Sequence, residues 1–313
     1  MLEEINDIPS FETFSKIQII DKGWSSDKKY YVETKTGEKR LLRISDISEY
    51  EKKKNEFDIM KRLSTVGINM SQPLDFGTCD NNKKVYQLLS WCEGEEAKEL
   101  LSFLSDTEQY ELGIEAGKIL KILSNLEKSE PSSDWANFFK RKIDTDIERY
   151  INRGIRFKDD ELLIEFLKDN VHLMKNRPTC LTHEDFQTDN LVISPDKKLF
   201  VIDFQQCGIV DPYYALMSVG VSAETSPQFA FGQLDEYFRG QIPEDFWQLV
   251  NYYLLAETFN IFLVALTLDQ EEIDFANEFM PATIKSLDNL GNYVPDWFLS
   301  RNNKKLVSSK NDI

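Results

Sequence analysis

THEDFQTDNLVISPDKKLFVIDF, residues 182–204, contains two short apolar runs on either side of a tight turn. The turn is SPDK, residues 194–197, and the runs around it predict an antiparallel hairpin. Folding the chain about this turn brings Asn190, just before the first strand, close to Asp203, at the end of the second. An amide oxygen and a carboxylate then meet at the open end of the hairpin. Such hard oxygen ligands suit Mg²⁺, which takes few protein ligands and completes its shell with nucleotide phosphates and water.

Asp185 lies one loop before the hairpin and can face the same position. The order His183-x-Asp185-x-x-x-x-Asn190, followed by an Asp-Phe pair at Asp203, resembles the catalytic loop and metal loop of protein kinases. The closer resemblance is to the aminoglycoside phosphotransferase family, which has the same loop, then a Val-Ile-Asp-Phe strand and a Gly-Ile-x-Asp-Pro segment. Here that segment is GIVDP, residues 208–212. The resemblance in arrangement covers nearly the whole chain, although the diagnostic motifs lie close together.

This resemblance implies a role for each motif residue. Asp185 would accept the proton of the acceptor hydroxyl or orient its oxygen. Asn190 and Asp203 would hold Mg²⁺. His183 is implied to brace the catalytic loop, as a structural residue.

The fold class follows from the change of pattern along the chain. Turn clusters bound four short apolar runs that predict strands, at residues 17–20, 30–33, 40–44 and 85–90. One helix is expected among them, from about residue 48 to 63, and helical spacing dominates after Gly94. We therefore expect an α+β, two-lobed, protein-kinase-like fold, with a small β-rich N-lobe and a larger, mainly helical C-lobe. We place the nucleotide-binding lobe at residues 1–91, the catalytic and substrate-binding lobe at 92–300, and a frayed polar tail at 301–313.

The nucleotide end is expected in the first lobe. Kinase-like folds place a cation on a strand and pair it with a carboxylate on the following helix. The strand candidate is Arg43, where the family usually has Lys. Arginine keeps the charge and can clasp phosphate bidentately. The helix candidate is Glu56, which shares a stripe with apolar residues and therefore needs a partner, and Glu51 is an alternative.

Two further segments are candidates for nucleotide contacts. GWSS, residues 23–26, stands where the family has its phosphate-covering loop. Ser25 and Ser26 could donate hydrogen bonds to phosphate, or the segment is an ordinary hairpin turn. The run ending at Ser90 and Trp91 is expected to be the interlobe hinge, where backbone groups meet the purine. No G-x-x-x-x-G-K-[ST] sequence occurs, so a P-loop NTPase is not supported, and ATP and GTP both stay open as donors.

Composition narrows the class of protein. Lys and Arg number 37 against 54 Asp and Glu, which gives a net charge of −17. This balance argues against nucleic-acid and anionic-membrane partners and is compatible with a cationic small molecule. The four cysteines form no C-x-x-C pair, and two histidines are too few for a multi-His metal site. The N-terminal residues lack a signal-peptide pattern and no apolar run is long enough for a membrane helix, so we expect a cytoplasmic protein.

Acidic residues of the later helices are the candidates for binding the acceptor. In the family, such residues meet the ammonium groups of the substrate. Glu257 is the strongest candidate because it lies among apolar residues such as Tyr253 and Phe259, and Asp211 and Glu272 complete the predicted substrate set. For the acidic cluster at residues 269–274, a solvated helix face is the alternative.

These features predict an Mg²⁺-dependent phosphotransferase. It would move the γ-phosphoryl group of ATP or GTP to a hydroxyl of a small cationic, aminoglycoside-like substrate, with antibiotic resistance as the implied context. One alternative is a metabolic small-alcohol kinase of the choline or homoserine kinase type. Another is a nucleotide-binding pseudo-enzyme with little turnover, motivated by Arg43, the Gly-poor phosphate loop, and Glu184 where Gly is usual. Gln205 replaces the Gly of Asp-Phe-Gly, on which this family does not depend.

Overall fold

The computed structural model describes residues 3–21, 26–267, 270–286 and 293–301, with several side chains of residues 271–286 outside that description. The chain divides into two compact units. Unit 1 comprises Met1–Leu104 and Thr188–Cys207, and unit 2 comprises Ser105–Gln187 and Gly208–Ile313. The chain therefore crosses between the units three times, whereas the sequence suggested a single boundary after residue 91.

Unit 1 is built on a five-stranded antiparallel sheet in the order β1-β2-β3-β5-β4. Its strands are β1 (Phe14–Ile20), β2 (Lys28–Thr34), β3 (Lys39–Asp46), β4 (Pro73–Cys79) and β5 (Lys84–Ser90). The strand not expected from the sequence is β4, which contains Pro73 and Gly77. Proline is tolerated at the start of an edge strand, and β4 is at the edge, so tertiary pairing with β5 overrides a weak local pattern.

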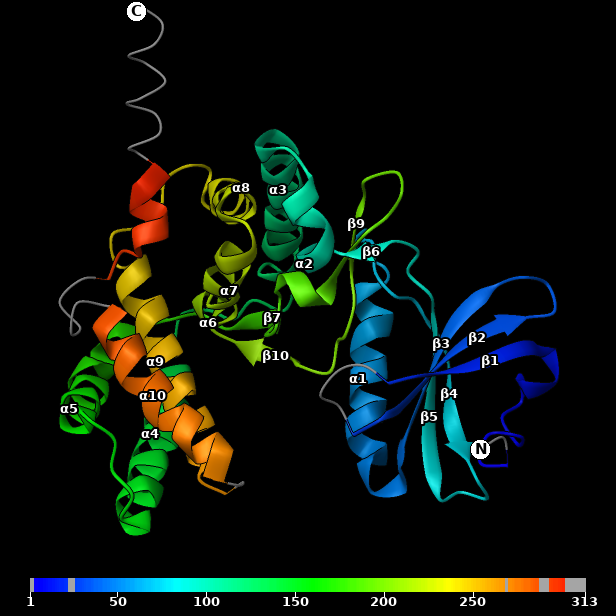
Figure 1. Cartoon of the computed structure of the whole chain (residues 1–313), viewed down its shortest axis with the longest axis horizontal. Helices are drawn as coiled ribbons and strands as arrows, with labels where there is room; N and C mark the ends of the chain where they lie inside the picture. Colours follow the sequence, from blue (N-terminus) through cyan, green and yellow to red (C-terminus); the bar gives the residue numbers. More distant parts are fainter. Residues whose placement is uncertain (1–2, 22–25, 268–269, 287–292, 302–313) are drawn as a thin grey trace, which may run out of the picture. The chain divides into compact units, whose positions relative to one another are not determined.

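Helix α1 (Tyr50–Leu63) lies against the sheet beside β4 and β5 (Figure 1). The 3₁₀ turn η2 (Ile47–Glu49) precedes it, and the Asp46 carboxylate caps this turn by accepting a hydrogen bond from the Ser48 N–H. The buried face of α1 is apolar except for two charged residues, Lys53 and Glu56. Buried charges need partners, so this face indicates a polar cluster inside unit 1.

The hairpin expected near residue 190 is present in unit 1. Strand β8 (Leu191–Ile193) pairs antiparallel with β9 (Leu199–Val201), and β6 (Glu95–Glu96) pairs with the other side of β8. A parallel bridge also joins Met70 to Val201. These pairings between distant segments explain why residues 188–207 belong to unit 1 and why this unit continues past residue 91 through α2 (Ala97–Leu100).

Unit 2 is mainly helical, as expected. Its helices are α3 (Asp106–Leu123), α4 (Asp134–Arg153), α5 (Asp160–Asp169), α6 (Pro212–Ala215), α7 (Ser218–Thr225), α8 (Pro227–Phe238), α9 (Phe246–Ala265) and α10 (Gln270–Ser286). A two-stranded sheet of β7 (Cys180–His183) and β10 (Cys207–Val210) accompanies them. Helix α3 begins with a capping box in which Ser105 and Glu108 bind each other's backbone N–H groups.

Helices α3 and α8 lie side by side in unit 2 (Figure 1). A Cβ atom at Gly113 would lie 2.1 Å from the Phe229 carbonyl oxygen, and one at Gly232 would lie 2.3 Å from the Tyr110 carbonyl oxygen. Any side chain at either position would overlap backbone, so glycine permits this close approach.

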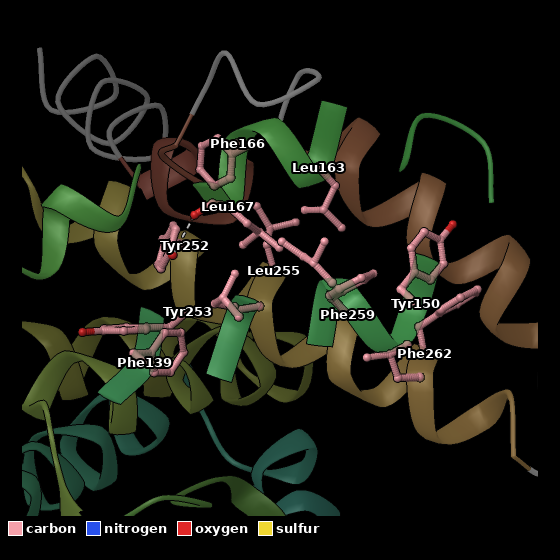
Figure 2. Close-up of a cluster of buried hydrophobic side chains, with 14 of the residues drawn as sticks. Phe139, Tyr150, Leu163, Phe166, Leu167, Tyr252, Tyr253, Leu255, Phe259 and Phe262 are labelled. Carbon is pink, nitrogen blue, oxygen red and sulfur yellow. Dashed lines mark hydrogen bonds between the residues drawn. The ribbon is translucent and has the colours of Figure 1, made fainter. Parts of the chain in front are cut away.

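Helix α9 lies at the centre of the aromatic core of unit 2. Figure 2 shows side chains of α4 and α5 packed around Tyr252, Tyr253, Phe259 and Phe262 of α9. Within this core, the Tyr252 hydroxyl donates to the Leu167 carbonyl at 2.9 Å. The core thus gives a rigid support to Glu257, the one acidic residue of α9.

None of the described helices is both long enough and apolar enough to cross a membrane.

Candidate active site

The open end of the β8–β9 hairpin holds Asn190 and Asp203. The Ile202 N–H donates to the Asn190 carbonyl oxygen at 3.0 Å, so the two segments lie side by side there. Asp203 has a φ of +57°, in the left-handed region that aspartate adopts more readily than most residues. This conformation turns the chain at the point where the second strand ends.

An amide oxygen and a carboxylate at this position fit Mg²⁺ chemically. Magnesium prefers oxygen ligands and usually keeps several sites for substrate phosphates and water. Within the part of the chain that the structure describes, no group of three or more His, Cys, Asp or Glu could hold a metal ion. Phosphate and water oxygens would complete a site made by Asn190 and Asp203, as is usual for Mg²⁺. Metal binding by this pair stays a prediction.

Arg43 on β3 is buried and bound by two carboxylates. Its Nε and Nη2 donate to Asp27 Oδ2 at 3.1 and 2.9 Å, and its Nη1 donates to Asp203 Oδ1 at 3.1 Å. Glu56, which the sequence suggested as its partner, instead lies 3.4 Å from Lys53 within the same helix. The structure thus places Arg43 beside the candidate metal ligand, with a different carboxylate holding it.

That carboxylate, Asp27, was not expected to be functional. Its side chain is only 3% exposed. Besides Arg43, it accepts hydrogen bonds from Ser45 Oγ at 2.7 Å, Lys53 Nζ at 2.9 Å and Gln205 Nε2 at 2.9 Å. Burial alone would raise the pKa of the Asp27 carboxyl, but Arg43, Ser45 and Lys53 outweigh burial and hold this pKa below its usual range.

Sequence reasoning missed Asp27 because an aspartate beside serines before a strand is typical of a turn. A usable signal was present in α1. Lys53 shares a helical face with Phe57 and Met60, and a lysine in register with buried residues requires an anionic partner.

The other predicted nucleotide contacts are only partly described. Ser25 lies outside the described residues, and Ser26 is exposed. The Ser90 N–H donates to the Gln72 carbonyl at 2.8 Å, and the Trp91 N–H donates to the Lys39 carbonyl at 3.2 Å. These two donors are therefore used within unit 1, and purine binding at the hinge stays a prediction that rests on other groups.

The catalytic-loop residues before the hairpin belong to unit 2. His183 is fully buried, and its Nδ1 accepts a hydrogen bond from the Asp185 N–H at 3.3 Å. The His183 ring also packs edge to face against Phe186, with 6.0 Å between ring centroids. This geometry is consistent with His183 bracing the loop that carries Asp185. Because Asp185 lies in unit 2 and Asn190 and Asp203 in unit 1, their convergence stays a prediction.

Glu184, next to the predicted catalytic aspartate, fills space left by a glycine. A Cβ atom at Gly208 on β10 would lie 2.3 Å from Glu184 Oε1, so the unusual glutamate is matched by a residue without a side chain. Burial and, second, the negative charge of Glu257 raise the pKa of the Glu184 carboxyl. Glu184 thus lies within electrostatic range of the predicted substrate residue.

Glu257 lies beside a cation, Lys142. Its Oε1 lies 3.1 Å from Lys142 Nζ, but without the geometry of a hydrogen bond, and this oxygen is buried. Lys142 is shared with Asp146 at 3.3 Å. Burial, followed by Glu257 and Glu184, also raises the pKa of the Tyr214 hydroxyl. The group formed by Glu184, Glu257, Tyr214 and Lys142 therefore contains more acid than base.

Asp211 occupies a different kind of environment. It is fully buried, and Arg177 donates to both of its carboxylate oxygens, at 2.7 and 2.9 Å. The Tyr253 hydroxyl donates to it at 2.9 Å, and Asp211 also caps α6 through the Tyr213 N–H. A substrate cation would have to displace Arg177, so this geometry favours a structural role. The side chain of Glu272 lies outside the described residues.

The chain is similar to known proteins both in sequence and in fold. A model of the phosphotransferase enzyme family matches residues 16–247. Acyl-CoA dehydrogenase family member 10 of Mus musculus is 25% identical over 244 residues, which is 68% of this chain. The chain spans only 22% of the length of that relative.

The solved structures of similar fold include kinases of small molecules. Aminoglycoside phosphotransferase APH(4)-Ia, in a ternary complex with ADP and hygromycin B, matches with a TM-score of 0.69 and 14% identity over 91% of this chain and 98% of its own. The GDP and kanamycin complex of APH(2'')-IIIa matches with a TM-score of 0.66 and 15% identity over 90% and 96%. A fructosamine-3-kinase-type protein from Haemophilus somnus 129PT matches with a TM-score of 0.65 and 14% identity over 91% and 98%. These likenesses confirm the expected kinase-like fold.

Proposed function

The chain belongs to the phosphotransferase enzyme family, and on that basis we propose that it is a small-molecule kinase that transfers the γ-phosphoryl group of a nucleoside triphosphate to a hydroxyl group. The observation that carries this proposal is the 3.1 Å contact between Arg43 Nη1 and Asp203 Oδ1. It joins the strand cation and the candidate metal ligand, two groups that are 160 residues apart in sequence and that phosphoryl transfer needs in one place.

Each residue has a defined task in the proposed reaction. Arg43 binds phosphate oxygens and neutralises their charge, while Asn190 and Asp203 hold Mg²⁺ against the nucleotide. Bound Mg²⁺ supplies charge neutralisation and orientation of the phosphates. Asp185 accepts the proton of the acceptor hydroxyl or orients its oxygen. Phosphoryl transfer depends mainly on positioning and charge neutralisation, so these few groups suffice.

The acceptor in this proposal is a small cationic molecule with a hydroxyl group. The acid-rich group around Glu184 and Glu257 supports it, because the charge of Glu257 acts on the nearby Glu184, Lys142 is divided between Glu257 and Asp146, and an ammonium group would balance the acids. Two solved structures of similar fold hold hygromycin B and kanamycin, which adds support for aminoglycoside-like acceptors.

A metabolic substrate is the second candidate. The likeness to a fructosamine-3-kinase-type protein, which has nearly the same TM-score as the aminoglycoside enzymes, favours it. Amino alcohols and amine-linked sugars carry the same pair of groups, a cationic nitrogen and a hydroxyl. The proposed chemistry at Asp185 and Asp203 is identical for both candidates.

One panel of experiments tests the proposal. Thermal shift with Mg²⁺ and either ATP or GTP should raise the Tm for the true donor, since a ligand that binds only the folded state stabilises it. Mass spectrometry should then detect an added phosphoryl group on one member of a set of aminoglycosides, amino alcohols, fructosamines and neutral sugars. Nucleotide binding without any product in this set would favour the pseudo-enzyme, and the absence of both binding and product would contradict the proposal.

A further inference from the structure

We propose that Asp27 is the positioning residue of the nucleotide site, holding Arg43 and the segment after Asp203 in one fixed arrangement. This inference rests on the proposed function, in which Arg43 binds nucleotide phosphates. Kinase-like folds pair the strand cation with a carboxylate on the helix that follows the strand. In this chain the pairing carboxylate is instead that of Asp27, just before β2.

The first observation is the geometry of Arg43. Nε and Nη2 both donate to Asp27 Oδ2, so one edge of the planar guanidinium is bound to one carboxylate. The remaining nitrogen, Nη1, donates to Asp203 at 3.1 Å. An arginine bound along one edge cannot rotate without breaking two charge-assisted hydrogen bonds. Asp27 therefore decides which way the third nitrogen of Arg43 points.

The second observation is the contact between Asp27 and Gln205. Gln205 Nε2 donates to Asp27 Oδ2 at 2.9 Å. Gln205 lies two residues after Asp203, in the position of the Gly of Asp-Phe-Gly. Asp27 consequently contacts both the strand cation and the segment that carries the candidate metal ligand. A glycine at position 205 would lack this second contact.

The third observation concerns how Asp27 is itself held. Its Oδ1 accepts from Ser45 Oγ at 2.7 Å, and its Oδ2 also accepts from Lys53 at 2.9 Å. The side chains of Asp27, Arg43 and Lys53 are 3%, 5% and 3% exposed. Charges buried this completely and bound from several sides have a single arrangement, which is what positioning for phosphoryl transfer requires.

Glu56 does not supply the same support. Its only ion pair among the described residues is with Lys53 at 3.4 Å, and its Oε1 is buried without a hydrogen-bond partner in that part of the chain. Glu56 forms an ion pair with Lys53, and Lys53 forms one with Asp27. Glu56 is therefore connected to Arg43 only through Lys53 and Asp27, whereas Asp27 contacts Arg43 directly.

The experiment is a double-mutant cycle on the full chain with the nucleotide that stabilises it. Asp27→Asn keeps the size of the side chain and removes its charge. We expect it to raise the nucleotide KM by about 10- to 100-fold, because it removes hydrogen bonds between charged groups. The nucleotide Kd, measured by calorimetry without acceptor, should rise by the same factor. The acceptor KM should stay unchanged.

Two comparisons make the result specific. In the Arg43→Ala background, Asp27→Asn should add less than about 3-fold, because a residue that acts through Arg43 has no effect once Arg43 is gone. Asp75→Asn is the matched control. Asp75 is a carboxylate of the same sheet that accepts from the Tyr86 hydroxyl at 2.9 Å, and its loss should leave the nucleotide KM unchanged.

Several outcomes would overturn the inference. These are a wild-type nucleotide KM and Kd in Asp27→Asn, full additivity with Arg43→Ala, or a larger effect of Glu56→Gln than of Asp27→Asn. If Asp27→Asn does not fold, Gln205→Ala removes one of the contacts, and an unchanged nucleotide KM in that variant overturns it equally. If the wild-type protein binds no nucleotide, the proposed function fails and this inference fails with it. Wild-type binding that Asp27→Asn leaves intact contradicts the inference alone.

Discussion

Each unit contains a group of charges, buried in unit 1 and half-buried in unit 2, and the balance of charge differs between them. In unit 1, Arg43 and Lys53 both bind the carboxylate of Asp27, and its pKa is lowered despite burial. In unit 2, Glu184 lies near a second acid, Glu257, and burial together with that neighbour raises the pKa of Glu184. A buried carboxylate in unit 1 thus contacts two cations, whereas a half-buried carboxylate in unit 2 lies near another acid.

This difference indicates what each group is suited to bind. Buried guanidinium and ammonium groups form a favourable environment for anionic phosphates, whereas two neighbouring acids such as Glu184 and Glu257 favour an incoming cation. The net charge of −17 describes neither place, because it averages over the whole chain. Local composition of the two groups, and not the overall charge, carries the information about donor and acceptor.

Removing the candidate metal ligand should have the largest effect. Asp203→Ala should reduce phosphoryl transfer below detection, since it deletes both the proposed Mg²⁺ ligand and a contact of Arg43. Its side chain is 32% exposed, so the fold should survive, as circular dichroism and thermal melting can verify. Asp196→Ala, in the exposed turn of the same hairpin, should keep full turnover. Equal Mg²⁺-dependent activity in Asp203→Ala would show that the metal is held elsewhere.

Asp185→Asn should separate chemistry from binding. Loss of the group that accepts the proton should lower kcat by about 10²- to 10⁴-fold, while the nucleotide Kd stays at its wild-type value. Single-turnover kinetics and calorimetry on the same preparation measure the two quantities. An unchanged kcat would mean that another residue handles the proton of the acceptor hydroxyl.

Substitution of Arg43 tests the cation-rich group of unit 1 directly. Arg43→Ala should raise the nucleotide KM by about 10- to 100-fold and lower kcat, because it removes charge-assisted hydrogen bonds and leaves Asp27 buried with less compensation. Arg43→Lys should retain much of the activity, since the charge remains. Steady-state kinetics with varied nucleotide distinguish the two variants. If Arg43→Ala has wild-type kinetics, another cation binds the phosphates.

Glu257→Gln tests the acid-rich group of unit 2. We expect the acceptor KM to rise a few-fold, about the value of a partly exposed ion pair, with no change in the nucleotide KM. The wild-type acceptor KM should also rise with salt, because charges are screened beyond about 8–10 Å at physiological ionic strength. Glu165→Gln, an exposed acid on α5, is the control and should change neither constant. A neutral acceptor that is turned over fastest and is insensitive to salt would contradict this assignment.

The smallest expected effect is on stability, through Glu184. Because its pKa in the folded protein is raised above the ordinary value of 4.5, ionising it costs free energy of folding. The cost is absent below the unfolded-state pKa and grows as the pH rises through the folded-state pKa. Glu184→Gln should therefore melt a few degrees above the wild type near pH 8, with the difference shrinking toward pH 4. In a Glu257→Gln background the difference should be smaller, and a difference independent of pH would contradict this account.

Much of the architecture could be predicted because it is encoded locally. The turn at Gly37, where φ is +85°, and the alternating residues around it defined two strands of the sheet. The apolar runs around Pro195 likewise defined the β8–β9 hairpin and hence the proximity of Asn190 and Asp203. Strand β4 escaped prediction because an edge strand with Pro and Gly has little pattern of its own.

The candidate site likewise contains residues that local sequence predicted and a contact that only the tertiary structure revealed. Motif spacing by itself pointed to Asp185, Asn190 and Asp203, since these residues lie within one short segment, and the turn between β8 and β9 brings the segments of Asn190 and Asp203 side by side. The partner of Arg43 could not be read in this way. Glu56 and Glu51 were the candidates that the sequence offered, and only the packing of α1 and β3 in the folded unit directs Lys53 and Arg43 toward Asp27. Local sequence determines residues that act through neighbouring turns, whereas ion pairs between distant segments depend on which side chains the folded core buries together.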